Sequence, residues 1–341
     1  MSNLFSINRR SFLFSSLILS TGFFSTSLAM AETTDTFKPF SFVFLSDCHL
    51  GAGVHDSYKL TQESQLFLQE AIKQINLLSP DFVIFGGDQV DGPGNEEANW
   101  QFFLDIMQSL DCPWQFVLGE ADVSGGNQVN KMHIYGRDWR GLGLNNSQPY
   151  WSYDELSGVH LVGLDTSVAD STTGFVSDEQ LQWLKNDLAQ AKASLILLIS
   201  HHPLLPPPPF DQSNKAAQYL LPQASLVRDI LTANGKQTLA LSGHIHISKI
   251  ERQNNVSYIS CPSLDVYPCA FRYFQITPQK MEIQTHQVNF PALVKKAKSN
   301  LLDSSLASDL TAGHQHNFVS LALGSRVDQN NSLALSGNEV Q

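Results

Sequence analysis

Short apolar runs recur along the chain, and each has the length of a single strand that is buried on both faces. Phe, Val, Ile and Leu dominate these runs, and a polar or turn-forming stretch follows every one of them. The pattern therefore predicts buried strands at residues 40–45, 81–85, 114–118, 195–200 and 237–242.

Helical periodicity fills the intervals between these runs. Apolar side chains spaced three or four residues apart predict helices that contain residues 61–78, 95–110, 177–191 and 226–231. Because strands and helices alternate in this way in parallel βαβ units, the predicted fold class is α/β.

The second half of the chain carries further strand patterns. Residues 149–154 and 159–164 predict a hairpin around a Ser157–Gly158 turn. The runs at residues 256–260, 271–276 and 281–286 are interpreted as antiparallel strands. From about residue 300 onward no periodicity is visible, so the sequence predicts a disordered tail over residues 300–341, in which His314 and His316 are solvated and have no role.

Side chains that can bind metal follow the buried strands at the point where each strand ends. The carboxyl ends of such strands lie along one edge of the sheet, so these side chains are expected to converge. Carboxylates combined with imidazoles suit zinc, iron, manganese or nickel. Any single motif could instead be an Asp that caps a turn beside a His that packs, but the arrangement recurs. The set comprises Asp47, His49, Asp88, Glu120, His201, His244 and His246.

Composition limits the class of partner. The chain has 341 residues, of which 16% are charged, and its net charge is −11. This acidity argues against nucleic acid and against an anionic membrane as partners, because no basic surplus is available to meet phosphates. A small phosphorylated substrate is compatible with it. Arg137 and Arg140 are candidates to bind the substrate phosphate, and ordinary surface ion pairs are the alternative reading of both.

The N-terminus has the pattern of an export signal. Arg9 and Arg10 directly precede a moderately apolar stretch, and Ala29-Met30-Ala31 fits a cleavage site. The pattern predicts a twin-arginine signal over residues 1–31, the export machinery as a partner and a periplasmic protein with no membrane anchor after cleavage. Cleavage removes two arginines and no acidic residue, so the net charge changes from −11 to −13. The alternative is an uncleaved anchor.

Four cysteines remain after such cleavage. Cys261 and Cys269 flank a loop and could form a disulfide in an exported protein, or both could be free thiols. Cys48 lies between two candidate ligands and is expected to be a small buried side chain.

The order of these motifs resembles the calcineurin-like metallophosphoesterases. Asp47-Cys48-His49, Gly87-Asp88, Gly119-Glu120-Ala121-Asp122, His201-His202-Pro203 and Gly243-His244-Ile245-His246 fall in the family's order over residues 38–288. The resemblance implies a four-layer αββα sandwich with two mixed β-sheets flanked by helices. It also implies a hydrolase of phosphate mono- or diesters, in which a hydroxide that bridges two metals attacks phosphorus. With the export signal, the prediction is an exported phosphoesterase.

The resemblance further implies a role for each ligand. Asp47, His49 and His246 would bind one ion, and Asp88 would bridge to the other. Glu120, His201 and His244 would complete the second site. The two ions would be transition metals chosen from Fe, Mn and Zn.

The third motif departs from the family pattern. Glu120 stands where the family has Asn, and Ala121 stands where it has the His that is assigned to protonate the leaving group or to steady the phosphate. Loss of a general acid typically costs about 10²–10⁴ in rate. His202, His133 or His55 could compensate, although packing is the alternative role for His202. The rival function is therefore a metal-binding protein of the same fold with little or no hydrolase activity.

Overall fold

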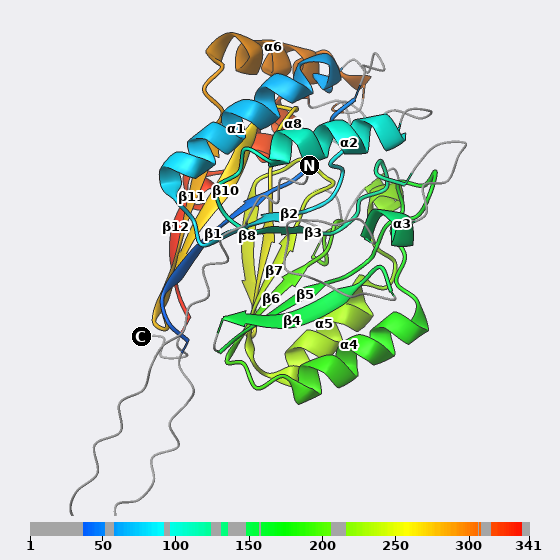
Figure 1. Ribbon diagram of the computed structural model, residues 1–341, viewed down its shortest axis with the longest axis vertical. Coiled ribbons are helices and arrows are strands. Elements are labelled where there is room, and N and C mark those ends of the chain that lie inside the picture. The colour runs from blue at the N-terminus through cyan, green and yellow to red at the C-terminus, as the bar shows by residue number, and fades with distance from the viewer. Residues whose placement is uncertain are drawn as a thin grey trace, which may run out of the picture. The chain divides into compact units, whose positions relative to one another are not determined.

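The computed structural model shows two β-sheets, each with helices on its outer face (Figure 1). It describes residues 37–51, 58–91, 96–123, 131–135, 148–156, 158–205, 216–305, 307 and 315–335. All of these residues belong to one unit of the chain, Asp35–Gln341. The predicted export signal over residues 1–31 lies outside the described residues.

The first sheet has six strands in the order β12-β11-β10-β1-β2-β3. In sequence order they are β1 (Phe40–Leu45), β2 (Phe82–Phe85), β3 (Trp114–Phe116), β10 (Ala270–Ile276), β11 (Lys280–Gln287) and β12 (Asn330–Ala334). β1, β2 and β3 are parallel to one another, and β10 is antiparallel to β1. The parallel half of the sheet therefore aligns the carboxyl ends of the first three strands.

The second sheet also has six strands, in the order β4-β5-β6-β7-β9-β8. They are β4 (Trp151–Leu156), β5 (Val159–Gly163), β6 (Leu195–Ile199), β7 (Gln237–Ser242), β8 (Lys249–Gln253) and β9 (Val256–Ser260). β5, β6, β7 and β9 run parallel, and β4 and β8 are antiparallel edge strands. Both sheets are thus mixed.

Helices complete the four layers. α1, α2 and α6 lie on the outer side of the first sheet, and α4 and α5 lie on the outer side of the second (Figure 1). The helical segments are η1 (Thr61–Glu63), α1 (Ser64–Leu78), α2 (Glu96–Met107), α3 (Lys131–Tyr135), α4 (Asp178–Gln190), η2 (Ala216–Tyr219), α5 (Ala224–Asn234), α6 (Pro291–Leu302), α8 (Gln315–Leu323) and α9 (Arg326–Gln329). The predicted αββα fold is confirmed.

β6 shows why the central strands read as unbroken apolar runs. Leu195, Leu197 and Ile199 belong to the core that contains strands of both sheets. The alternate residues Ile196 and Leu198 pack in a second cluster with side chains of α4 and α5. Because side chains of a strand alternate between its faces, a strand with a core on each side must be apolar at every position.

The predicted disordered tail is wrong for the residues that the structure describes. α8 and α9 form there, and β12 pairs with β11 from Lys280–Ala334 to Gln284–Asn330. Ser325 caps α9 with a capping box that includes Asp328. β12 is polar because it is an edge strand, which needs no alternating apolar face to pair. His314 lies outside the described residues, as does the side chain of His316.

Two smaller expectations also change. β9 runs parallel to β7 and is antiparallel only to β8, a strand that the sequence pattern did not predict.

Cys48, Cys112, Cys261 and Cys269 are all free thiols, so the disulfide alternative is wrong. Cys48 is buried, as expected. None of the helices in the described ranges is long and apolar enough to cross a membrane.

Candidate metal centre

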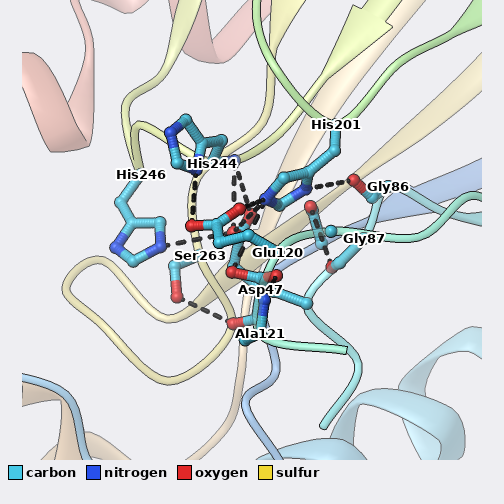
Figure 2. A network of polar contacts seen from close by, with 12 residues as sticks. Asp47, Gly86, Gly87, Glu120, Ala121, His201, His244, His246 and Ser263 are labelled. Carbon is cyan, nitrogen blue, oxygen red and sulfur yellow. Dashed lines mark hydrogen bonds and ion pairs between the residues drawn. The ribbon is translucent and has the colours of Figure 1, made fainter. Parts of the chain in front are cut away.

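All seven predicted ligands lie directly after strands, and the fold brings them into two adjoining groups. Asp47 and His49 follow β1, Asp88 follows β2, Glu120 follows β3, His201 follows β6, and His244 and His246 follow β7. Parallel strands end at the same edge of their sheet, and the two facing sheets bring these edges together. Figure 2 shows the rings of His201 and His244 beside Glu120.

The first group, called the first position below, consists of Asp47, His49 and His246. Nε2 of His246 lies 3.3 Å from Oδ1 of Asp47. Nε2 of His49 lies 3.3 Å from Oδ2 of Asp88. His49 and Asp47 are completely buried. The donor set of two imidazoles and carboxylate oxygens suits a transition-metal ion.

The second position consists of Asp88, Glu120, His201 and His244. The two oxygens of Glu120 face different rings, with Oε2 2.9 Å from Nε2 of His201 and Oε1 3.1 Å from Nδ1 of His244. Oδ2 of Asp88 lies 3.5 Å from Nε2 of His201. The same oxygen therefore faces a histidine of each position, which makes Asp88 the geometric link between them.

Left-handed backbone is concentrated at these ligands. Asp47, His49, Asp88, His244 and His246 all have φ between 43° and 67°, a region that non-glycine residues rarely adopt. Such strain persists where surrounding contacts impose it, and it clusters at functional sites. Here the amide of His49 donates to the carbonyl of Asp88 at 3.0 Å, and the amide of His244 donates to the Asp47 carboxylate at 3.1 Å.

Gly87 allows a close approach between the backbone and a ligand ring. Its φ is +103°, and a Cβ added there would lie 2.2 Å from Nδ1 of His201. Nδ1 of that ring donates to the carbonyl of Gly86 at 2.7 Å. The ring can reach this carbonyl only because residue 87 has no side chain.

The ring hydrogen bonds fix which nitrogen faces the carboxylates. A carbonyl can only accept, so Nδ1 of His201 carries the proton and Nε2 carries the lone pair in the neutral ring. Nδ1 of His49 similarly meets Oδ1 of Asp265 at 2.9 Å. Within the described part of the chain, Nε2 of His49 and Nε2 of His201 are buried and have no hydrogen-bond partner. Both nitrogens face carboxylates, an arrangement that fits bound metal ions.

The charges of the metal-free site are strongly interdependent. Burial raises the pKa of Asp88, but the neighbouring rings of His201 and His49 outweigh it and hold the pKa well below its usual range. Burial lowers the pKa of His201, but Asp88 and Glu120 outweigh it and place the pKa well above the ordinary value. Burial and Asp88 raise the pKa of Glu120, and His244 and His201 reverse this to leave it well below normal. The carboxylates are thus ionised in the metal-free protein, and their negative charge favours the binding of a cation.

The altered third motif keeps two backbone contacts. The amide of Ala121 donates to Oδ1 of Asp88 at 2.9 Å, so position 121 still orients the linking carboxylate. Asp122 is completely buried and accepts from the amides of Gly119 at 2.8 Å and Val90 at 3.0 Å. Asp122 ties the loops after β2 and β3 together. Its role was missed, although its place in the motif was visible in the sequence. The methyl side chain of Ala121 cannot transfer a proton.

The geometry of His202 favours the packing alternative over catalysis. Its Nδ1 meets the hydroxyl of Thr166 at 2.8 Å, and its Nε2 meets the carbonyl of Thr172 at 3.2 Å. Burial, reinforced by His244, lowers the pKa of His202 well below its ordinary value, so the ring is neutral. The ring packs on His244 with a centroid distance of 4.3 Å. With both nitrogens bonded within the fold, His202 is not available to protonate a leaving group.

The other sequence candidates are not placed. His55, Arg137 and Arg140 lie outside the described residues, and so does the side chain of His133 on α3.

Comparison with known proteins identifies the family. The model of the calcineurin-like phosphoesterases matches residues 40–248, a range that contains all seven ligands and covers more than half of the chain. The chain belongs to the calcineurin-like phosphoesterase family. Membership of this family supports a phosphoester hydrolase.

Two sequence relatives and one solved structure illustrate the likeness. A probable glycerophosphodiester phosphodiesterase GpdQ of Arcobacter nitrofigilis is 28% identical over 225 residues, which cover 63% of this chain and 78% of that protein. A cAMP/cGMP dual specificity phosphodiesterase of Mycobacterium tuberculosis is 27% identical over 224 residues, 64% of each chain. The fold resembles a dimetal phosphatase from Danio rerio, with a TM-score of 0.59 and 15% identity over 72% of this chain and 95% of the other.

Proposed function

We propose that the protein is a metal-dependent phosphodiesterase with two transition-metal ions, chosen from Fe, Mn and Zn. The observation that carries the proposal is the arrangement of seven ligands in two groups that meet at Asp88. Asp47, His49, Asp88 and His246 would hold one ion, and Asp88, Glu120, His201 and His244 would hold the other. Bound ions would activate water as a nucleophile and stabilise charge on the phosphate oxygens.

The residues of the chain supply position and charge. The backbone turns at Asp47, Asp88 and His244 hold the ligands in place before the ions bind, which reduces the ordering required on binding. The three ligand carboxylates, Asp47, Asp88 and Glu120, balance the charge of two cations. None of the seven ligand side chains is available to protonate a leaving group, because each is assigned to an ion.

Phosphodiesters are the favoured substrate class because the sequence relatives carry phosphodiesterase names. Ala121 further limits which phosphodiesters should react fast. Without an acid at this position, a substrate whose leaving group departs as a stable anion should react faster than one that needs a proton. Activated aryl diesters are therefore the expected best substrates among synthetic esters.

A phosphoester panel tests the proposed function. Purified protein loaded with Mn, Fe or Zn should hydrolyse bis(4-nitrophenyl) phosphate faster than 4-nitrophenyl phosphate, and His201→Ala should abolish this activity. His286→Ala is a matched control, because it removes a half-buried imidazole of β11 that belongs to neither position. Metal-loaded protein that hydrolyses no ester in the panel would favour the metal-binding protein without hydrolase activity.

We also propose that the protein is exported by the twin-arginine pathway and acts in the periplasm. The proposal rests on Arg9, Arg10 and the small residues before Glu32 in the sequence. Arg9→Lys with Arg10→Lys should leave precursor in the cytoplasm, as seen by cell fractionation and immunoblotting. The exported wild type should begin at Glu32. Sequencing that finds Met1 or Ser2 on the exported protein would show an uncleaved anchor instead.

A further inference from the structure

Asp265 is a buried carboxylate that no sequence motif marks. It lies in the loop between β9 and β10, 216 residues from His49 along the chain, and it is completely inaccessible to solvent. Its Oδ1 lies 2.9 Å from Nδ1 of His49. An ionised carboxylate can only accept, so the proton of this hydrogen bond belongs to the ring. In the neutral ring, which metal binding requires, Nε2 of His49 then carries the lone pair on the side of Asp88, 3.3 Å away.

The loop that carries Asp265 is anchored to the ligand segment after β1. The hydroxyl of Ser263 accepts from the amide of Asp265 at 3.2 Å and lies 2.9 Å from the carbonyl of Asp47. The amide of Leu264 donates to the carbonyl of Asp47 at 3.2 Å. These bonds fix the carboxylate relative to the ring that it contacts. The fold therefore sets the position of the Asp265 carboxylate relative to the ring of His49.

The two metal positions hold their histidines differently. Nδ1 of His49 is held by a carboxylate, whereas Nδ1 of His201 is held by the neutral carbonyl of Gly86 at 2.7 Å. A carboxylate partner orients a ligating histidine and also raises its basicity. Burying an ionised carboxylate costs free energy unless the charge is paired or hydrogen-bonded. Within the described residues, Oδ2 of Asp265 has no hydrogen-bond partner, so the fold does not fully compensate this burial.

We propose that Asp265 is a positioning residue that orients His49 and strengthens metal binding at the first position alone. The inference rests on the proposed function, because it presupposes that His49 binds an ion. It assigns Asp265 no contact with the substrate or with the metal. The proposal predicts that the metal affinity of the second position does not depend on Asp265.

Variants that retain a single metal position separate this role from a general structural one. His201→Ala leaves the first position to bind zinc, and His49→Ala leaves the second. Adding Asp265→Ala should weaken zinc binding about 10–100-fold in the His201→Ala background, the usual effect of losing an outer-shell partner. In the His49→Ala background it should change zinc affinity less than about twofold. A structural defect would weaken zinc binding in both backgrounds.

Zinc titration of the full mature chain with a competing chelator measures these affinities. Asp265→Asn keeps the size and one acceptor and should lose about tenfold in affinity at the first position, because the charge is gone. Asp187→Asn is the matched control, since that carboxylate also contacts a histidine, His160 at 2.7 Å, which belongs to neither position. Thermal unfolding shows whether each variant is folded. If Asp265→Ala does not fold, the comparison is made with Asp265→Asn.

The outcomes distinguish this inference from the proposed function. Equal zinc affinity of Asp265→Asn and its parent at the first position would overturn the role of Asp265, as would equal losses at both positions. Wild-type protein that binds no zinc, manganese or iron would instead overturn the proposed function.

Discussion

The two metal positions differ in how closely the chain keeps the family pattern around them. At the first position, Asp47, His49 and His246 match the motifs residue by residue and are buried, and the ring of His49 contacts Asp265. At the second, the sequence has Glu120 where the resemblance leads us to expect Asn. Its side chain is 14% exposed and contacts both histidines of that position.

This difference indicates where the chemistry of the protein departs from its family. Glu120 places a further negative charge at the second position, which would strengthen cation binding and lower the acidity of water bound to an ion there. Ala121 beside it has no side chain that could donate a proton. The first position should therefore behave as in the family, and the second should determine which esters react.

The largest expected effect comes from removing the residue that the positions share. Asp88→Ala should lower activity more than about 10⁴-fold, because both activation of water and stabilisation of charge are lost. Bound metal should fall from about two ions per chain to less than about one, since Asp88 faces a histidine of each position. Elemental analysis and the rate on an aryl diester measure the two effects. If Asp88→Ala retains both ions, Asp88 is not a ligand that the two positions share.

Restoring the family residues at the second position should have the next largest effect. Glu120→Asn combined with Ala121→His should raise turnover of poor leaving groups by about 10²–10⁴, and that of aryl esters much less. The measurement is the dependence of rate on leaving-group pKa for both proteins at equal metal loading.

Two results would contradict this reading of the second position. One is a double variant that gains nothing on alkyl esters. The other is a wild type that already hydrolyses alkyl and aryl esters equally fast. Either result means that another group supplies the proton. The side chains of His133 and His55 would then be the first to substitute, because His202 has both ring nitrogens bonded.

The pH dependence of metal binding should be smaller but measurable at both positions. Burial lowers the pKa of His49 and His201, but carboxylates outweigh it and raise both pKa values well above normal. Protonation of these rings stabilises the metal-free fold fully below about pH 6.5, the unfolded value, and this stabilisation is lost as pH rises through the folded pKa values. Metal requires the neutral rings, so binding releases protons.

Apparent metal affinity should consequently fall as pH decreases from 8 to 6, by roughly tenfold per pH unit for each proton released. Calorimetric titrations in buffers of different ionisation enthalpy count the released protons. An affinity that does not change over this range would show that neither histidine is protonated in the metal-free protein.

The sequence predicted the parts of the site that local patterns encode. An apolar strand followed by Asp47 or His201 is visible because the strand and the ligand are contiguous. The meeting of these strand ends follows from parallel pairing, which the alternation with helices indicates. Asp265 could not be predicted in this way, because it lies in an irregular loop and meets His49 only through the tertiary fold.

Two further features depended on context instead of pattern. β12 is polar and begins with two Asn residues, and only its pairing with β11 makes it a strand. His202 reads in sequence like a catalytic residue beside a ligand. Its hydrogen bonds to Thr166 and Thr172, which come from distant segments, favour a packing role.

Anomalous diffraction from crystals of the metal-loaded protein would locate the ions themselves. We expect two peaks, one among Asp47, His49 and His246 and one among Glu120, His201 and His244, with Asp88 between them. Data collected on both sides of the absorption edges of Mn, Fe and Zn would identify each ion. Absence of both peaks after reconstitution with these metals, or a single peak that contacts none of the seven residues, would contradict this expectation.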